Sequence, residues 1–362
     1  MNQRYQTPEL SVIVPVLNEE AVLPTLFATL SHQRSVDFEL ILCDGGSQDR
    51  TPELCRQAVA ACNFPVRCLQ TAPGRARQMN VGAQAATGEL LLFLHVDSQF
   101  SSPQALADGL AAWRDGRHRW GDTLAGHFRL VFNGPGNQHP AYRFYTRKAR
   151  SGRRGTIHGD QGFLLSASWF RRLGGYPEDL PLLEDTRLAD HILHEGHWLL
   201  LPAEILTSNR RFENEGLLAR QVLNALVMNF AAIGWTPFFT EARGFYRQQA
   251  TAGPLDLGPF FTLIARLLRQ QARSERRRIW SRTGDYVYSQ GWQLGLALDC
   301  RGCHGADCVS ADGAGIWEAR FESWFNRHSD NRISRQLTAL LVYSWFHLTR
   351  RYMVWRTKRR VS

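Results

Sequence analysis

The stretch GELLLFLHVDSQF, residues 88–100, joins an apolar run from Leu90 to Leu94 to the pair His95 and Asp97. A short, unbroken apolar run is typical of a strand in a parallel sheet that is covered on both faces. In open α/β sheets, ligands bind beyond the carboxyl ends of such strands, which is where this pair stands. The pair is therefore a candidate functional site. The alternative is that Asp97 and Ser98 only cap a following helix.

The chain before this strand alternates between strand and helix patterns. Apolar runs predict strands at residues 10–16, 38–43 and 66–70. Helices are predicted from about residue 19 to 32, over 51–61 and from about 75 to 86. Short connections between alternating strands and helices predict an α/β fold whose parallel sheet is built from right-handed crossovers.

After residue 120 the alternation is less regular. Strands are predicted in TLAGHFRLVF (123–132), QGFLLS (161–166) and HWLLLPAEI (197–205), and LEDTRLADHILHEG (183–196) predicts an amphipathic helix. From about residue 250 the pattern becomes helical and rich in Arg and aromatic residues. We therefore expect an α/β catalytic domain over residues 9–250 and a mainly helical extension over residues 251–362.

Positive charge is concentrated at the C-terminal end of the chain. The formal net charge is +10, and residues 1–250 carry 25 Lys and Arg against 24 Asp and Glu. Residues 251–362 carry 18 against 9. This asymmetry predicts an anionic partner surface, either phospholipid or nucleic acid. No recognised nucleic-acid-binding motif accompanies the charges, so we expect no nucleic acid.

Two stretches of the sequence are relevant to a signal peptide and to membrane-spanning segments. The first residues lack the basic, apolar and cleavage regions of a signal peptide, so we expect a cytoplasmic protein, with a peripheral place on the inner face of the plasma membrane as a further option. The longest apolar segment, Val222–Phe239, is interrupted by Asn224, Asn229, Gly234 and Pro237. These interruptions favour a buried or interfacial helix over a membrane span.

Carboxylates follow three of the predicted strands. Glu19 and Glu20 follow the first, Asp44 the second and Asp97 the fourth. Because parallel strands end at one edge of a sheet, these side chains are expected to line one crevice. The first turn, PVLNEE, is not the Gly-rich loop of a dinucleotide-binding dehydrogenase, and no phosphate-loop motif is present.

A crevice of acids needs positive charge to hold a diphosphate. A divalent cation on Asp97, with Arg75 or Arg77 nearby, would supply it, since Mg²⁺ takes one or two carboxylates and completes its shell with phosphate oxygens and water. The alternative for the two arginines is a solvated helix face. Glu184 and Asp185 stand at a predicted helix start, where the helix dipole keeps carboxylates ionised, as a general base requires. Ordinary helix capping is the alternative there.

Together these motifs resemble glycosyltransferase family 2 over roughly residues 9–250. The resemblance rests on VIVPVLNEE, LILCDGGSQDRT, GRARQMNVGAQAATGELLLFLHVDS and GGYPEDLPLLEDTRLADHILHEG, in this order. It implies the GT-A fold, a three-layer αβα arrangement with a mostly parallel Rossmann-like sheet. A similar His-x-Asp and a GDQG stretch also occur in the radical-SAM/selenodomain-associated transferases, a subgroup that this chain resembles.

The resemblance assigns roles to residues at matching positions. It implies nucleotide-sugar contacts for Pro15, Asn18, Glu19, Asp44, Arg75 and Asn80. His95 replaces the first Asp of the family's Asp-x-Asp, and it is expected to contact the substrate. Asp97 matches the Asp that holds a Mg²⁺ or Mn²⁺ ion. Asp185, beside Glu184, matches the carboxylate that removes the acceptor proton. Asp160 and Gln161 are expected on the acceptor side, and Arg210 or Arg211 near the diphosphate.

The resemblance implies an inverting, metal-dependent glycosyltransferase with a nucleotide-sugar donor and a sugar or lipid-linked acceptor. One alternative is a sugar nucleotidyltransferase, although the Gly-rich N-terminal loop of those enzymes is missing. Another is a degenerate transferase whose C-terminal extension binds an anionic surface. Intact Asp44, Asp97 and Asp185 favour the enzyme.

Two features of the extension lie outside the resemblance. The stretch CRGCHGADC places Cys300, Cys303, His304 and Cys308 at a spacing that fits haem attachment, a metal site or a loop of reduced thiols. The tail SWFHLTRRYMVWRTKRR, residues 344–360, mixes four aromatic residues with basic ones. It predicts contact with an anionic membrane. The alternative is that its aromatic residues pack the last helix onto the protein.

Overall fold

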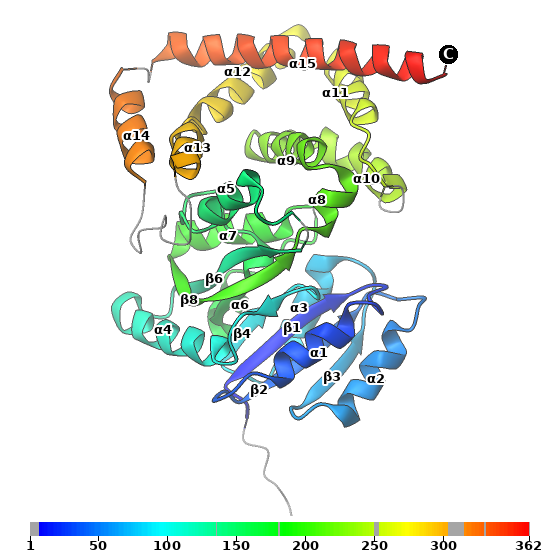
Figure 1. The fold of residues 1–362 in the computed structure, drawn as a ribbon, viewed down its shortest axis with the longest axis vertical. Coiled ribbons are helices and arrows are strands. Elements are labelled where there is room, and N and C mark those ends of the chain that lie inside the picture. The colour runs from blue at the N-terminus through cyan, green and yellow to red at the C-terminus, as the bar shows by residue number, and fades with distance from the viewer. Residues whose placement is uncertain are drawn as a thin grey trace, which may run out of the picture. The chain divides into compact units, whose positions relative to one another are not determined.

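Eight strands form one mixed sheet in the described part of the chain (Figure 1). The computed structural model describes residues 7–134, 136–179, 182–249, 253–302, 315–328 and 331–361. The strands are β1 (Leu10–Val16), β2 (Phe38–Asp44), β3 (Val66–Gln70), β4 (Leu90–Phe93), β5 (Gln99–Phe100), β6 (Leu124–Asn133), β7 (Phe163–Ser166) and β8 (His197–Ser208). Their order is β3-β2-β1-β4-β7-β6-β8-β5.

The sheet has a parallel half and a mixed half. Strands β3, β2, β1 and β4 are mutually parallel, whereas β7 runs antiparallel to both of its neighbours, β4 and β6. Strands β6 and β8 are parallel, and the short β5 is antiparallel to β8. Helices flank both faces of this sheet, so the predicted α/β class with a mostly parallel core is confirmed.

The chain divides into two compact units. The first, here called the sheet unit, comprises Met1–Asn137 and Tyr145–Ser208. The second, the helical unit, comprises Gln138–Phe144 and Asn209–Ser362. The division after Ser208 lies before residue 250, where the catalytic domain was expected to end. That expected boundary marks the extent of the family resemblance, and it stays a prediction.

Helices of the sheet unit pack on strands whose residues are almost wholly apolar. They are α1 (Leu23–Ser31), α2 (Thr51–Ala61), α3 (Arg75–Ala85), α4 (Ala105–Trp120), η1 (Gly159–Gln161), α6 (Ala167–Arg172) and α7 (Glu184–Glu195), and α5 (Pro140–Ala149) spans the division. Every residue of β2 is buried. On α3, a Cβ at Gly82 would lie 2.5 Å from Ile13 Cγ2, so glycine lets this helix approach β1 closely.

Helical packing defines the second unit. Its helices are α8 (Arg210–Glu215), α9 (Leu217–Ala232), α10 (Pro237–Gln249), α11 (Gly258–Gln270), α12 (Arg273–Ser289), α13 (Trp292–Gly302), α14 (Ile316–His328) and α15 (Arg332–Val361). Helices α11 and α12 both pack on α15. A Cβ at Gly284 of α12 would lie 2.6 Å from the Cβ of Ala339, which shows how close α12 and α15 approach. Among the described helices, none has both the length and the apolar content that a membrane crossing requires.

Three sequence predictions need correction. The helix expected from Glu19 begins at Leu23, after a turn in which Glu19 O accepts hydrogen bonds from two following N–H groups. Asp97 and Ser98 do not cap the next helix, because β5 intervenes and α4 begins at Ala105. The apolar segment 222–239 forms parts of α9 and α10 rather than one helix, since Gly234 adopts a φ of 67° between them.

Candidate active site

The loops after β1 and β2 are joined by polar contacts at the carboxyl edge of the sheet. Asn18 has a left-handed φ of 56°, its N–H donates to Ser47 Oγ at 2.8 Å, and its Oδ1 accepts from Gln48 N at 2.8 Å. Ser47 in turn donates from Oγ to Asp44 Oδ1 at 2.6 Å. Asp44 Oδ2 is buried and has no hydrogen-bond partner in the described residues, so it is available to accept from a ligand.

The other residues predicted for the nucleotide lie in the same region of the sheet unit. Pro15 belongs to β1, where it pairs with Cys43 of β2. The N–H of Glu19 donates to Thr51 Oγ1 at 2.8 Å, at the start of α2. The structure therefore brings Pro15, Asn18, Glu19 and Asp44 to the ends of two neighbouring parallel strands, as the sequence predicted. Their contact with a nucleotide stays a prediction.

Arg75, the first residue of α3, connects the β4 edge to α7. Its guanidinium contacts His95 Nε2, and its Nε lies 3.6 Å from Glu184 Oε1. Burial and the Arg75 charge hold the pKa of His95 well below its usual value, against a smaller effect of Asp185. His95 is therefore neutral, and its Nε2 accepts from Arg75. Burial and the neighbouring Asp185 raise the pKa of Glu184, against the effect of Arg75.

The loop before β7 brings Gly159 between His95 and Asp185. The N–H of Gly159 donates to Asp185 Oδ2 at 2.7 Å. A Cβ at Gly159 would lie 2.8 Å from His95 Nε2 and 3.1 Å from Asp185 Oδ2, so only glycine fits without displacing them. Asp185 Oδ1 accepts from its neighbour Thr186 N at 2.7 Å. Fixed hydrogen bonds to both oxygens hold the Asp185 carboxylate in one orientation.

The environment of Asp185 keeps it ionised. Burial opposes ionisation, but electrostatic interactions with His158 and Arg75 and the hydrogen bond from Gly159 outweigh it and lower the pKa of Asp185. The preceding residue, Leu183, has a left-handed φ of 68°, an unfavourable conformation for a leucine that sets the start of α7. Asp185 thus has a lowered pKa and a fixed orientation, and its role as a base stays a prediction.

Asp160 has the opposite character. Burial, with repulsion from Asp185 and Asp97, raises its pKa to about 6, while His158 and Arg75 oppose the shift. Its Oδ1 is buried without a partner in the described residues. Asp97 and Asp185 thus each repel the carboxylate of Asp160, and a cation bound beside Asp160 would relieve this repulsion. Within the described residues, no group of three or more His, Cys, Asp or Glu is arranged to hold a metal ion.

Two predicted residues have structural partners. Asn80 Nδ2 donates to Tyr176 O and to Glu178 Oε1, both at 2.9 Å, and Asn80 Oδ1 accepts from Tyr176 N at 2.8 Å. Asn80 thus holds the segment before α7 against α3. Gln161 is fully buried and donates from Nε2 to Thr156 O at 2.9 Å, so its amide nitrogen supports its own loop. Roles of Asn80 and Gln161 toward a ligand stay predictions.

Arg210 and Arg211 belong to α8 of the helical unit, where Arg211 Nε pairs with Glu215 Oε1 at 3.0 Å. Their expected contact with a diphosphate stays a prediction. Three residues of this region are not distinguished by any sequence motif above: Ser47, Thr186 and Tyr176. Tyr176 is buried, and burial and Asp185 raise its pKa well above the usual value, so it remains a neutral phenol. The GGYPEDL motif contained this residue, but nothing in the sequence distinguished its ring from core packing.

The cysteine cluster of the extension is only partly visible. Cys300 is buried at the end of α13, where it packs with Trp292 and Leu296. Cys303, His304 and Cys308 lie outside the described residues. The choice among haem, metal and thiol loop therefore stays open.

Comparison with known proteins relates part of the chain to one family. Residues 11–174 match the model of the family described as glycosyl transferase family 2. The chain is 39% identical over 103 residues to a PGL/p-HBAD biosynthesis glycosyltransferase of Mycobacterium tuberculosis, a match that covers 28% of this chain and 40% of that protein. It is 36% identical over 95 residues to an undecaprenyl-phosphate 4-deoxy-4-formamido-L-arabinose transferase of Aeromonas hydrophila, covering 25% and 29%. The matches thus span less than half of these relatives.

The fold resembles that of a solved family structure. A mannosyltransferase from Pyrobaculum calidifontis, determined in complex with GDP-Man and Mn²⁺, aligns over 95% of this chain and 87% of its own, with a TM-score of 0.50 and 17% identity. At this identity the likeness concerns the fold alone. The resemblance to the radical-SAM/selenodomain-associated subgroup stays a prediction. Residues 11–174 thus match glycosyltransferase family 2, and the fold of the chain is similar to that of a solved mannosyltransferase.

Proposed function

We propose that this protein is an inverting glycosyltransferase that uses a nucleotide-sugar donor. One observation carries the proposal: the carboxyl edge of the sheet unit gathers a fixed, ionised Asp185 beside the neutral His95 and the cation Arg75. The unpartnered Asp44 Oδ2 in the adjoining loops adds an acceptor for the nucleotide. A sugar nucleotidyltransferase gains no comparable support, because the loop after β1 lacks the glycines that such an enzyme would use.

In this mechanism Asp185 acts as the general base. Its carboxylate takes the proton from the acceptor hydroxyl as the hydroxyl oxygen forms a bond to the anomeric carbon. The bond from that carbon to the diphosphate oxygen breaks on the opposite face, so the configuration inverts. The nucleoside diphosphate leaves with the bonding electron pair. Arg75 is the cation of the site that faces the developing negative charge.

Asp97 and Asp160 offer oxygen ligands to a divalent cation. Asp97 repels Asp160, whose Oδ1 is buried without a partner in the described residues, and the two carboxylates would hold Mg²⁺ or Mn²⁺. Because the described residues contain no group of three His, Cys, Asp or Glu suited to a metal, phosphate oxygens of the donor and water would have to complete the shell. The ion would neutralise charge on the leaving diphosphate.

The substitution Asp185→Asn tests the base. It keeps the shape of the side chain and removes its basicity, so transfer should fall by about 10²-fold or more while donor binding persists. A thermal-shift panel of nucleoside diphosphates with Mn²⁺ or Mg²⁺ first identifies the nucleotide, and release of that nucleotide from its sugar donors then reports transfer. Asp190→Asn on the same helix is the matched control, because Asp190 pairs with Arg154. If Asp185→Asn transferred sugar at the wild-type rate, Asp185 would not be the general base, and Glu184 or Asp160 would be the next candidate. Failure of the wild-type protein to bind any nucleotide would favour the degenerate transferase.

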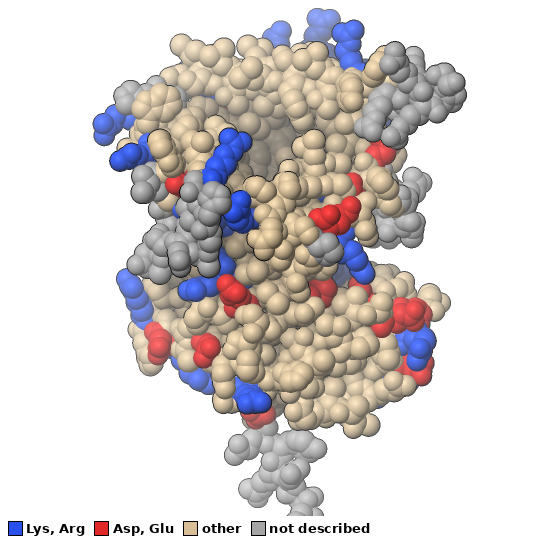
Figure 2. Space-filling model, in the orientation of Figure 1, with Lys and Arg blue, Asp and Glu red and all other residues tan. Residues whose placement is uncertain are grey.

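We also propose that the acceptor is lipid-linked and is met at an anionic membrane. The name of the Aeromonas relative includes a polyprenyl phosphate, which supports such an acceptor. Helix α15 adds support, because it carries a stripe of exposed apolar residues spaced by three or four: Leu337, Leu341, Trp345, Leu348, Tyr352 and Trp355. Uncharged surface predominates along the upper edge of Figure 2, where α15 lies, with basic side chains projecting beside it.

The opposite face of α15 is used for packing. Phe346 is 2% exposed and stacks on Phe261 with ring centroids 5.2 Å apart. Phe346 therefore packs inward, as the alternative for this tail expected, while Tyr352 and Trp355 are exposed. Trp345 is 42% exposed, and its ring centroid lies 5.8 Å from that of Phe261.

Sedimentation with phosphatidylglycerol vesicles tests the membrane contact. The double substitution Leu341→Ser and Leu348→Ser removes two side chains that are 70% and 67% exposed, so the fold should persist and vesicle affinity should fall about tenfold. Leu218→Ser is the control, since Leu218 is 74% exposed on α9. High salt should also weaken binding. Equal recovery of all three proteins with the vesicles would refute the role of α15.

A further inference from the structure

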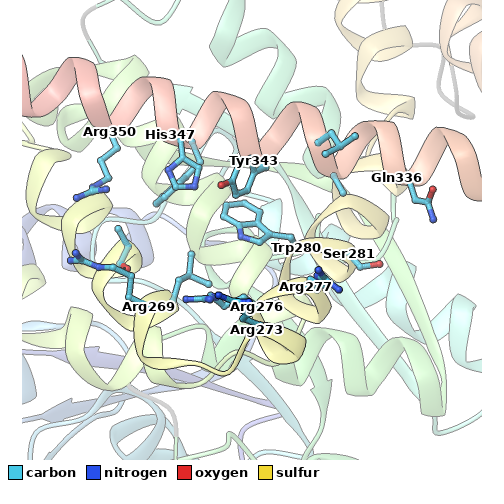
Figure 3. A pocket seen from close by; sticks show the side chains of 15 residues that line it. Arg269, Arg273, Arg276, Arg277, Trp280, Ser281, Gln336, Tyr343, His347 and Arg350 are labelled. Carbon is cyan, nitrogen blue, oxygen red and sulfur yellow. The ribbon is translucent and has the colours of Figure 1, made fainter.

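An open cavity with many basic side chains lies within the helical unit. It has a volume of about 780 Å³ and is lined by residues of α11, α12 and α15 (Figure 3). Five arginines contribute to its lining: Arg269, Arg273, Arg276, Arg277 and Arg350. No Asp or Glu lines it. This composition gives the cavity a positive potential that no lining group offsets.

These arginines lack the ion pairs that neighbouring arginines make. On α12, Arg278 pairs with Glu275 at 2.8 Å, and on α11, Arg266 pairs with Glu241. In the part of the chain that the structure describes, none of the five lining arginines has a carboxylate partner. Arg350 Nε is buried there without any hydrogen-bond acceptor. A buried guanidinium N–H without an acceptor is costly, so an anion in the cavity would be stabilised.

The other side of the cavity is apolar and aromatic. Trp280 lies between Tyr343 and the arginines of α12 in Figure 3, with its ring centroid 5.2 Å from that of Tyr343 and 5.5 Å from that of Phe346. Leu268 and Leu340 extend this wall. Because Trp280 packs against two aromatic rings, the wall keeps its shape without a ligand.

The first turn of α12 adds to the attraction for an anion. This helix begins at Arg273, and its N-cap position, Ala272, offers no side-chain acceptor to the free N–H groups. Arg273 and Arg276 belong to this turn, where they add two guanidinium charges to the positive end of the helix dipole. Glu275 of the same turn does not line the cavity and is paired with Arg278.

We propose that this cavity binds an anionic amphiphile, with a phosphate on the arginines and a hydrocarbon chain along Trp280, Phe346 and Leu340. Its volume is that of a small-molecule site, whereas a free phosphate would occupy a small part of it and leave the apolar wall in contact with water. The proposal stands on the helical unit alone and does not depend on the glycosyltransferase activity.

Calorimetric titration of the full chain with three probes tests the proposal. The probes are dodecyl phosphate below its micellar concentration, inorganic phosphate, and dodecyl maltoside, which has the same chain without the charge. Dodecyl phosphate should bind with one-to-one stoichiometry and at least tenfold more tightly than the other two. If inorganic phosphate bound with the same affinity as dodecyl phosphate, the proposal that the ligand is an amphiphile would be wrong. If several dodecyl phosphate molecules bound per chain, the proposal of one defined site would be wrong.

Neighbouring residues on α12 provide a matched pair of variants. Arg277→Gln removes a lining charge and should weaken dodecyl phosphate binding about tenfold. Arg278→Gln removes the same charge from a residue that does not line the cavity, and binding should be unchanged. Leu340→Asn, at a 62% exposed position, should weaken dodecyl phosphate but not inorganic phosphate. Equal effects of Arg277→Gln and Arg278→Gln would overturn the site in favour of general charge attraction.

Discussion

His127 should make the sheet unit sensitive to acid. The residue lies in β6, is 1% exposed and packs edge-on against Trp198 with ring centroids 5.6 Å apart. Its Nδ1 is buried without a partner in the described residues. Burial lowers the pKa of His127 to about 4, from an ordinary value of 6.5. Between these two values the unfolded state binds more protons than the folded state, so stability rises with pH in this window and is lost as pH falls from 6.5 toward 4.

The size of the effect follows from the pKa difference. At pH 5 the unfolded histidine is protonated and the folded one is neutral, so the loss relative to pH 7.5 is about 2 kcal/mol. The substitution His127→Phe keeps an aromatic ring and removes the titration. Urea unfolding of both proteins at pH 7.5 and 5.0 measures the difference. The wild-type protein should lose about 2 kcal/mol more than the variant, and His118→Phe, at an exposed position of α4, should behave as the wild type. An identical loss in wild type and His127→Phe would refute the reasoning.

Three further substitutions test the site and the core. Asp97→Ala should fold normally and lose metal-dependent binding of nucleoside diphosphate in a thermal-shift assay; unchanged affinity and metal dependence would contradict the assignment. Glu39→Gln should lower the free energy of unfolding by about 1–3 kcal/mol at pH 7, because the buried carboxylate accepts three hydrogen bonds. Burial raises the pKa of Glu39, but these hydrogen bonds outweigh burial, and the pKa in the folded state is lowered. The stability that ionised Glu39 contributes should therefore be lost as pH falls below 4.5 and through the pKa of the folded state. A difference between wild type and Glu39→Gln that does not change with pH would contradict this prediction. Gly82→Ala should cost about 1–3 kcal/mol through its clash with Ile13, seen as a lower Tm, whereas Gly244→Ala on α10 has open space and should not destabilise.

The sequence by itself determined the parallel half of the sheet and the resemblance of residues 11–174 to glycosyltransferase family 2. Short apolar runs such as Leu10–Val16 and Phe38–Asp44 have no alternation because both faces of those strands are covered, and this pattern is local. Parallel strands end at one edge, so the placement of Asp44 at the end of β2 and of Asp97 beyond β4 also followed from local information. The strand and helix patterns after residue 120 were likewise confirmed at β6, β7, α7 and β8.

Only the tertiary structure decided which distant residues complete the site. Strand β7 pairs antiparallel with β4, with Phe163 opposite Phe93, and this brings the preceding Gly159 loop beside His95. Strand direction depends on how the whole sheet closes its hydrogen bonds, and a short apolar run is equally compatible with either direction. The same holds for α15, whose pattern showed aromatic and basic residues but not which face would pack. Contacts with α11 and α12 bury Phe346 and leave the opposite face of α15 exposed. The buried face is set by helices that lie far from α15 in the sequence, so the local pattern could not predict it.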